Sequence, residues 1–261
     1  MWPRSQTNGL SRVLCTRSMS SSDGFVYDNE RPAHEADVPS FEIDRLPVTN
    51  ADFLLFVGDG GYRRREWWNE AGWAWREAEG IDRPHYWTAD GESRAFERIA
   101  PLDPDKPVMH VSWYEADAYA RSLGKRLPTE AEWEKAASWD EAAGAQRLHP
   151  WGDDPPAARL ANLDHTGFGP ARAGAYPAGA SPYGVLGMVG DAWEWTASDF
   201  SGYPGFEPFP YSEYSQIFFG GEYKVLRGGS WATRPSVARA SFRNWDYPMR
   251  RQIFSGFRCA A

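Results

Sequence analysis

LRGGSW, residues 226–231, is the densest structural signal in this chain of 261 residues. It closes a short apolar strand pattern at residues 224–227. Its glycine pair then permits backbone geometry, or a close approach of another segment, that other residues do not allow. Trp231 follows directly with a large ring that can fill a core. The stretch therefore predicts a short buried strand that ends in a tight turn.

The neighbouring pattern GDAWEW, residues 190–195, predicts a second extended segment. In an extended backbone Trp193 and Trp195 lie on one side and Glu194 on the other. Further strand patterns are brief and lie at residues 41–43, 109–111 and 256–259. The chain has 25 Gly, 20 Pro and 14 Trp, so short elements separated by long connections must pack around aromatic rings. We expect an α+β fold with much irregular structure.

Three short helices are predicted from their N-terminal caps. Ser112 with Glu115, and Thr129 with Glu132, have the spacing of a capping box. The helices are expected at residues 50–57 after Thr49, from Ser112 to an end at Gly124, and from Thr129 to about Ala137, with Trp133, Ala136 and Ala137 as the buried stripe of the last one.

Composition excludes several classes of function. The formal charge at pH 7 is −8, whereas a nucleic-acid surface needs an excess of Lys and Arg to neutralise phosphate. Mean hydropathy is −0.62, and no stretch approaches the roughly 20 apolar residues of a membrane helix. Cys15 and Cys259 imply no disulfide framework. We expect a cytoplasmic protein that binds neither nucleic acid nor membrane.

The domain organisation follows from a change in composition near residue 24. Residues 1–22 contain Arg4, Arg12 and Arg17, many Ser and Thr, and no acid. This composition fits an organellar transit peptide, or else a disordered or wrongly assigned start. Residues 1–23 are therefore expected to be a tail, and residues 24–261 a single domain.

Seven stretches occur in an order that resembles the formylglycine-generating-enzyme family, also called sulfatase-modifying-factor domains. They are residues 46–50 (LPVTN), 107–113 (PVMHVSW), 124–134 (GKRLPTEAEWE), 150–152 (PWG), 190–195, 226–231 and 256–259 (GFRC). The resemblance implies a fold related to C-type lectins that is low in regular secondary structure.

A second group of stretches is similar to one branch of this family, the sulfoxide synthases of ergothioneine biosynthesis. It comprises residues 27–35 (YDNERPAHE), 73–75 (WAW), 203–206 (YPGF), 242–248 (FRNWDYP) and 250–258 (RRQIFSGFR). The similarity covers the C-terminal half of such enzymes, which join a cysteine-derived thiol to the imidazole of hercynine. Formylglycine generators use a cysteine pair near the chain end, but residues 231–246 contain no cysteine, so that activity is not expected.

The resemblance implies iron(II) in the complete enzyme, held by histidines of an N-terminal helical bundle. The five histidines here include no pair three or four residues apart, so no helical face presents two ligands. We expect that this chain does not hold the iron. The bundle would be a separate chain, or would be missing because the gene start is wrongly assigned.

The resemblance also suggests site residues. Trp245 would pack against the hercynine side of the pocket, and Asn244 would also bind substrate. Asp246 and Arg250 would hold the amino-acid end of the thiol, either cysteine or γ-glutamylcysteine. A zwitterion needs a carboxylate for its ammonium and a guanidinium for its carboxylate. The alternative is a structural surface ion pair at positions i and i+4.

The family's active-site tyrosine would be Tyr211 or Tyr214, with Tyr211 favoured. A phenol with a pKa near 10 can supply a proton in a dry pocket. Either residue, taken singly, is equally well interpreted as a core or loop tyrosine.

Calcium is the other ligand that related domains imply. Asn162, Gly190, Ala192 and Glu194 offer the oxygen atoms that Ca²⁺ prefers. Gly187 stands where those domains carry an asparagine ligand, with Asp164 or Asp191 as possible substitutes. The histidines at positions 34, 110 and 149 are expected to be hydrogen-bonded structural residues.

Two hypotheses remain open at this point. The chain is either the substrate-binding half of an iron-dependent sulfoxide synthase, or a binding or scaffold module that kept the fold without catalysis. An oxidase with a metal site of its own is a more distant alternative, given the few cysteines and histidines.

Overall fold

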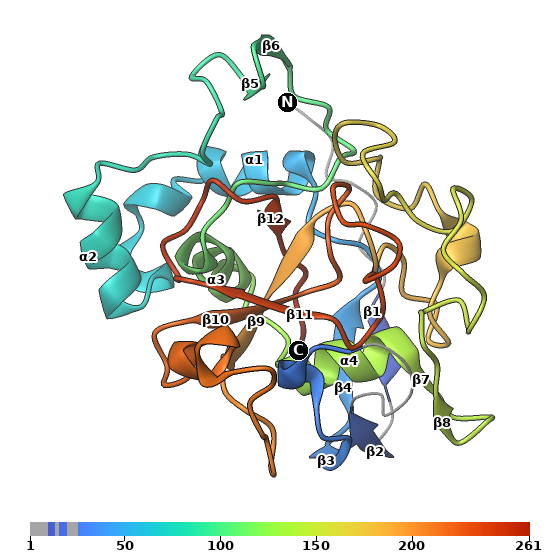
Figure 1. Ribbon diagram of the computed structural model, residues 1–261. Helices are drawn as coiled ribbons and strands as arrows, with labels where there is room; N and C mark the ends of the chain where they lie inside the picture. Colours follow the sequence, from blue (N-terminus) through green and yellow to red (C-terminus); the bar gives the residue numbers. More distant parts are fainter. Residues whose placement is uncertain (1–9, 14–15, 20–25) are drawn as a thin grey trace.

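The computed structural model describes residues 10–13, 16–19 and 26–261. Its helical elements are short, and most of the chain runs in connections (Figure 1). The helices are α1 (Asn50–Gly58), α2 (Glu70–Ala78), α3 (Trp113–Ser122) and α4 (Glu130–Ser138), and the 3-10 turns are η1 (Asp28–Glu30), η2 (Gly61–Arg63), η3 (Arg65–Trp67), η4 (Pro177–Gly179), η5 (Ser212–Tyr214) and η6 (Gln216–Phe218).

A four-stranded sheet forms the centre, in the order β11 (Arg243–Asp246), β10 (Lys224–Arg227), β9 (Trp193–Asp199) and β12 (Ser255–Gly256). β10 is antiparallel to both β9 and β11, whereas β12 runs parallel to β9. The strand predicted at residues 224–227 is therefore confirmed. Gly228 and Gly229 follow it with φ of +91° and +76°, and a Cβ on Gly228 would lie 2.6 Å from the carbonyl oxygen of Met188. This close approach explains the glycine pair.

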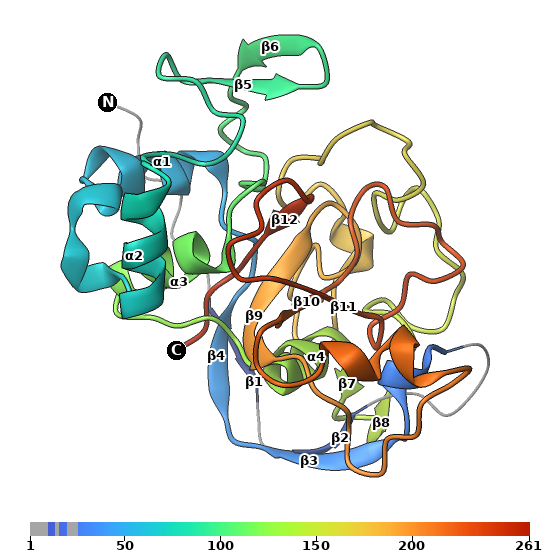
Figure 2. The same cartoon turned by 60° about the vertical axis from the view of Figure 1, so that its left-hand side comes forward.

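The remaining strands form antiparallel pairs at the periphery. They are β1 (Leu10–Val13) with β4 (Phe41–Asp44), β2 (Thr16–Met19) with β3 (His34–Val38), β5 (Glu92–Ala95) with β6 (Arg98–Pro101), and β7 (Trp139–Asp140) with β8 (Ala145–Gln146). The β5–β6 hairpin projects from the body of the molecule (Figure 2). Most of the predicted tail, residues 1–23, lies outside the described residues, and the described parts of it are β1 and β2.

Two apolar clusters flank the central sheet. One surrounds Phe53, Trp195 and Phe257, and the other surrounds Ile43 and Trp133. β9 contributes to both: the indole of Trp195 donates to the carbonyl of Val111 at 2.9 Å, whereas the carboxylate of Glu194 accepts from the indole of Trp133 at 2.7 Å. The predicted alternation of Trp195 and Glu194 across this strand is confirmed.

Charged side chains complete the interior. Arg227 is fully buried and donates to Glu130 at 2.7 Å and to Glu134 at 2.5 Å, both on α4. Arg243 on β11 also donates to Glu130, at 2.7 Å. Burial alone would raise the pKa of Glu130, but the guanidinium groups of Arg243 and Arg227 outweigh it and hold that pKa below its usual value. α4 is thus fastened to the sheet through its carboxylates.

The three helices predicted from their caps are confirmed to within a few residues. Thr49, Ser112 and Thr129 each accept a hydrogen bond from the backbone three residues on, in a complete capping box. α2 is an additional helix that we did not predict. It is capped by Asn69, whose side chain accepts from the backbone nitrogen of Gly72 at 2.8 Å.

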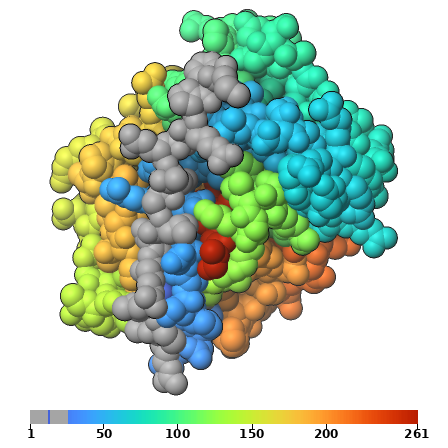
Figure 3. Space-filling model, turned by 180° about the vertical axis from the view of Figure 1, so that it is seen from behind, coloured from blue at the N-terminus to red at the C-terminus, as the bar shows by residue number. Residues whose placement is uncertain are grey.

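Two strand predictions need correction. Residues 109–111 form no strand, because His110 has a φ of +61° and this left-handed residue interrupts the extended backbone. The strand expected at residues 256–259 is β12, Ser255–Gly256, and the chain after it makes only an isolated bridge, at Ala260. Figure 3 shows the last residues, in red, between blue and green segments, and Ala260 bridges to Ile43 and Arg126 there.

Within the described ranges, no helix is long and apolar enough to cross a bilayer.

Candidate functional site

β11 carries three of the predicted site residues at the edge of the central sheet. Its pairing with β10 places Trp245 opposite Val225 and Asp246 opposite Lys224. The indole of Trp245 stacks on Phe200, with ring centres 4.0 Å apart and planes inclined by 7°. Alternation along the strand places Asn244 and Asp246 on the face opposite Trp245.

Asp246 and Arg250 meet, as their spacing predicts. Arg250 Nε donates to Asp246 Oδ1 at 3.1 Å, and the same oxygen accepts from the backbone nitrogen of Tyr247 at 2.8 Å. The side chain of Asp246 is 20% exposed and that of Arg250 is 46% exposed. In the described part of the chain, no hydrogen bond occupies the terminal nitrogens of Arg250. One carboxylate and one guanidinium fork are therefore presented side by side, as a zwitterionic ligand requires.

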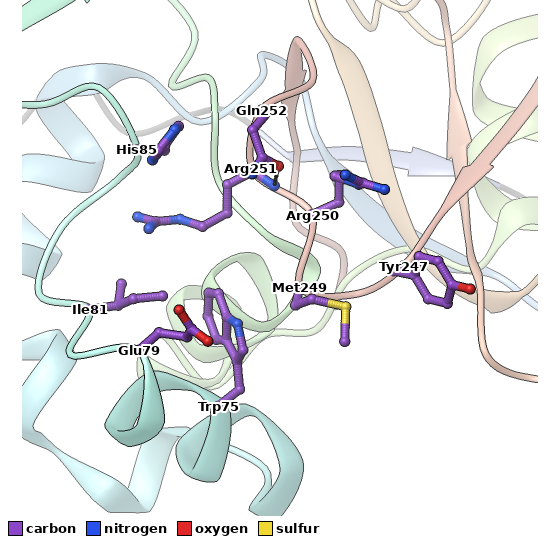
Figure 4. A pocket seen from close by; sticks show the side chains of 9 residues that line it. All are labelled: Trp75, Glu79, Ile81, His85, Tyr247, Met249, Arg250, Arg251 and Gln252. Carbon is purple, nitrogen blue, oxygen red and sulfur yellow. Dashed lines mark hydrogen bonds between the residues drawn. The ribbon is translucent and has the colours of Figure 1, made fainter.

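A cavity of about 480 Å³ lies beside this pair, between the end of α2 and the turn after β11 (Figure 4). It is lined by Trp75, Glu79, Ile81, His85, Tyr247, Met249, Arg250, Arg251 and Gln252. Figure 4 shows Arg251 directed between Ile81 and His85, whereas Arg250 leaves the same turn on the other side. Burial, reinforced by the charge of Arg251, lowers the pKa of His85, which favours its neutral form.

Arg251 is fixed by a buried carboxylate. Its Nε and Nη2 atoms donate to Glu115, each at 3.0 Å, and Glu115 is fully buried at the start of α3. Tyr62 donates to the same carboxylate at 2.5 Å. This contact holds the turn that presents Arg250. No local pattern indicates this contact, because the sequence predicts Glu115 only as part of a helix cap.

Tyr211 and Tyr214 lie on the connection between β9 and β10. Their ring centres are 6.1 Å apart and their planes nearly perpendicular. Tyr211 is 56% exposed, whereas Tyr214 is half-buried and stacks on Tyr27 with ring centres 6.0 Å apart. Burial, followed by the nearby Tyr27 and Asp28, raises the pKa of Tyr214, so its phenol stays protonated at neutral pH.

The tyrosines and the β11 residues are joined through intermediate rings. Phe218 on η6 packs on Trp245 with ring centres 5.4 Å apart, and Phe242, just before β11, stacks on Tyr27 at 5.6 Å. Within the described ranges, no contact joins Tyr211 or Tyr214 directly to Asp246 or Arg250. The tyrosine segment therefore adjoins Trp245, whereas Asn244 and Asp246 lie on the other face of the same strand.

Two of the four residues suggested for calcium, Glu194 and Asn162, use oxygen atoms in other hydrogen bonds. Both carboxylate oxygens of Glu194 accept from Arg258, each at 2.7 Å, and one also accepts from Trp133. The carbonyl of Asn162 accepts from the backbone nitrogen of Asp191 at 3.2 Å, and its amide donates to the carboxylate of Asp191 at 2.8 Å. A cation beside Glu194 would have to compete with a buried guanidinium. Because Arg258 already occupies the one carboxylate of this set, the donors do not fit calcium in this arrangement.

The five histidines are dispersed. His34 lies against Tyr203, His149 against Trp151 and His165 against Trp231, whereas the backbone nitrogen of His85 donates to the carbonyl of His110. Hydrogen bonds join Nδ1 of His34 to Pro32 and Nδ1 of His149 to Gly152, each at 3.2 Å. Nδ1 of His110 is buried without a partner among the described residues, although backbone groups of Arg251 and Ile253 still hydrogen-bond its ring. In those same residues, no three His, Cys, Asp or Glu side chains gather as metal ligands.

A family model described as the sulfatase-modifying factor enzyme 1-like domain matches residues 9–261. The chain belongs to this family. The solved structure of PvdO from Pseudomonas aeruginosa superimposes with a TM-score of 0.65 at 23% identity, and covers 96% of this chain and 93% of that one. CarF gives a TM-score of 0.60 at 20% identity, with 97% of each chain covered. These likenesses show the formylglycine-generating-enzyme fold with little regular secondary structure, as predicted.

The curated relatives of this chain include two hercynine oxygenases. Hercynine oxygenase of Mycolicibacterium thermoresistibile is 53% identical over 244 residues, which are 92% of this chain and 55% of that protein. The hercynine oxygenase of Mycobacterium tuberculosis is 53% identical over 89% of this chain and 55% of its own length. The chain thus spans about half the length of these relatives and matches their C-terminal part. The mouse protein named inactive C-alpha-formylglycine-generating enzyme 2 is 32% identical over 90% of this chain and 79% of its own.

Proposed function

We propose that this chain is the substrate-binding part of an iron(II)-dependent hercynine oxygenase. The observation that carries this proposal is the pairing of Asp246 with a half-exposed Arg250 beside a cavity, in a chain 53% identical to hercynine oxygenases. The reaction joins hercynine to a cysteine-derived thiol. A C–S bond forms as the imidazole C–H and the thiol S–H bonds break, and O₂ supplies one atom to the sulfoxide and one to water.

The roles of the binding residues follow from their charges. The carboxylate of Asp246 would receive the ammonium of the thiol substrate, and the terminal nitrogens of Arg250 would receive its carboxylate. Asn244 and Trp245 would bind hercynine. Trp245 is stacked on Phe200, so its ring is already oriented before a ligand arrives.

Tyr211 or Tyr214 would act as the proton donor in oxygen activation. Tyr214 is protonated at neutral pH, as a proton donor must be, although its raised pKa makes it a weaker acid than a free phenol. Tyr211 is 56% exposed in this chain, and a partner domain that covers it would exclude water from the reaction.

The iron belongs to that partner in this proposal. The side chains that the structure describes do not fit a histidine–carboxylate iron site, because the histidines lie apart among aromatic rings. A helical bundle from a separate chain or segment would hold the metal.

A chimera tests the proposal. The full chain is fused behind the part of the Mycolicibacterium thermoresistibile enzyme that precedes its matching region, and oxygen consumption is measured with Fe²⁺, hercynine and each thiol. We expect consumption that requires both substrates. In this chimera, Asp246→Ala should raise the KM for the thiol at least about tenfold. An unchanged KM would remove Asp246 from substrate binding.

Asp117 provides a matched control. It pairs with Arg121 through the same i,i+4 geometry, with Nε and Oδ2 2.9 Å apart, and neither residue lines the cavity. Asp117→Ala should leave the thiol KM unchanged.

A non-catalytic binding or scaffold role is the second candidate. Its support is the 32% identity to the mouse protein named an inactive formylglycine-generating enzyme. Cys259 offers no alternative chemistry, because burial, followed by the charge of Asp44, raises the pKa of its thiol far above the usual value. A folded chimera that binds both substrates without consuming oxygen would favour this second candidate.

A further inference from the structure

The segment that carries Tyr211 and Tyr214 has little structure of its own. Residues 209–219 contain only the two 3-10 turns η5 and η6, and the side chains of Phe209 and Tyr211 are 75% and 56% exposed. Its internal hydrogen bonds span three residues each, such as Tyr214 N to the carbonyl of Tyr211 at 3.1 Å. Contacts with other segments of the chain must therefore determine the positions of Tyr211 and Tyr214.

Ser215 is the buried residue of this segment. It lies between η5 and η6, and its side chain has no exposed surface. Its hydroxyl donates to Asp28 Oδ1 at 2.6 Å and accepts from Asn29 Nδ2 at 3.1 Å. The other oxygen of Asp28 accepts from the backbone nitrogen of Phe209 at 3.3 Å. In the described part of the chain, each hydrogen bond from residues 209–219 to another segment ends on Asp28 or Asn29.

These contacts flank the tyrosines on both sides. Phe209 precedes Tyr211 by two residues and Ser215 follows Tyr214 directly, so one carboxylate, Asp28, closes a loop around both phenols. Figure 2 shows the orange turns of this loop beside the blue turn η1, which contains Asp28. The ring of Tyr27, next to Asp28, stacks on Tyr214.

The η1 turn is itself held rigidly. Glu30 is fully buried and accepts from Arg239 Nε and Ser241 Oγ, each at 2.8 Å. The carbonyl of Asn29 accepts from Arg243 Nη1 at 2.6 Å. Arg243 belongs to β11 and precedes Trp245 by two residues. The same turn thus connects the tyrosine segment to the strand that carries the proposed binding residues.

From these contacts we infer that Asp28 and Ser215 are positioning residues, which hold Tyr211 and Tyr214 in place for the proposed reaction. The catalytic consequence of this inference rests on the proposed function. The contacts of Asp28 and Ser215 that hold residues 209–219, called the clamp below, do not depend on it. Displacing a proton donor by about 1 Å is enough to lower turnover roughly a hundredfold. Oxygen would then be consumed without a matching yield of sulfoxide.

Ser215→Ala tests the clamp in two ways, and Ser212→Ala is its matched control. Ser212 lies three residues earlier on the same segment, is exposed, and donates only to its neighbour Glu213. In the chain alone, hydrogen exchange of residues 209–219 should become roughly tenfold faster in Ser215→Ala, because a buried hydrogen bond is lost. Ser212→Ala should exchange like the unchanged chain.

The second measurement uses the chimera described above. Ser215→Ala should lower kcat and the ratio of sulfoxide formed to oxygen consumed, with the thiol KM unchanged. A smaller folded fraction would lower kcat but leave that ratio constant, so the ratio separates positioning from stability. Asp28→Asn keeps the size of the side chain but removes its charge, and should change exchange and ratio in the same direction, less strongly.

Each outcome decides the inference. If hydrogen exchange of residues 209–219 is unchanged in both Asp28→Asn and Ser215→Ala, the clamp is overturned. If Ser215→Ala does not fold, unchanged exchange in Asp28→Asn alone overturns it. Faster exchange with an unchanged product ratio overturns the positioning role. If the unsubstituted chimera consumes no oxygen, the proposed function fails, and exchange alone still decides whether Asp28 and Ser215 hold the segment.

Discussion

Arg250 and Arg251 are adjacent in sequence, but their surroundings differ. Arg251 meets the fully buried carboxylate of Glu115, and its side chain is only 12% exposed. Arg250 pairs with a partly exposed aspartate through one nitrogen, which leaves its two terminal nitrogens for a ligand. The buried carboxylate of Glu115 therefore neutralises Arg251 in the cavity wall, whereas Arg250 keeps its terminal nitrogens for an anionic group on the other side of the same turn.

His110 predicts how stability depends on pH. Burial, which outweighs its backbone hydrogen bonds, lowers the pKa of His110 to about 4. Because the unfolded chain then takes up a proton that the folded chain resists, this contribution is complete above pH 6.5 and is lost as pH falls toward 4. We expect the free energy of unfolding from urea titration to be about 2 kcal/mol lower at pH 5 than at pH 7 through this residue.

The control for this prediction is His110→Asn. Asparagine tolerates the left-handed backbone at this position, where φ is +61°, and does not titrate. The unchanged chain and His110→Asn should lose different amounts of unfolding free energy between pH 7 and pH 5. That difference measures the contribution of His110 alone, because the carboxylates that titrate in the same range are common to both proteins. Equal loss of stability in both between pH 7 and pH 5 would contradict a buried neutral His110.

Among the elements, α4 depends most on charge. Arg227→Ala removes the guanidinium that lies between Glu130 and Glu134 and leaves two carboxylates buried without it. Removing one partner of a buried ion pair costs about 3–5 kcal/mol, so the free energy of unfolding should fall by this amount in urea titration. Arg121→Ala breaks an exposed pair on α3 and should cost at most about 1 kcal/mol. Similar costs for the two variants would refute a special role for the buried network.

The sequence predicts elements whose local signals agree with their final structure. α1, α3 and α4 were predicted because their caps are hydrogen bonds between residues three apart. β7, β8 and β12 have two residues each, too few to show any periodicity. We did not predict α2, whose nine residues include three Ala and two Trp and which Asn69 caps in the structure.

The candidate site shows the same limit. Asp246 and Arg250 were predicted to meet because four residues separate them, and the structure brings them together. The opposite wall of the cavity comes from Trp75 and Glu79, and the clamp on the tyrosine segment joins residues 187 positions apart. Contacts at such separation are set by the packing of the whole domain, and no local pattern in one sequence reveals them.

For the whole molecule, the central question is whether it works without a partner. The chain matches only 55% of the length of each of the two curated hercynine oxygenases. Its own cavity is bounded by α2 and the turn after β11, and in the residues that the structure describes no set of ligands for a catalytic metal adjoins it. On the function proposed above, an iron-bearing domain would meet this surface.

We therefore predict that the purified chain, supplied with Fe²⁺, hercynine and a thiol, neither retains stoichiometric iron nor consumes oxygen in a thiol-dependent manner. Iron content after gel filtration and an oxygen electrode measure both. The same preparation should still bind the thiol, because Asp246 and Arg250 are already paired in the absence of any partner. Thiol binding without turnover would show that this chain binds the substrate and that catalysis also requires its partner. Stoichiometric iron with turnover would instead mean that dispersed side chains, such as His85 and His110 beside the cavity, rearrange around the metal.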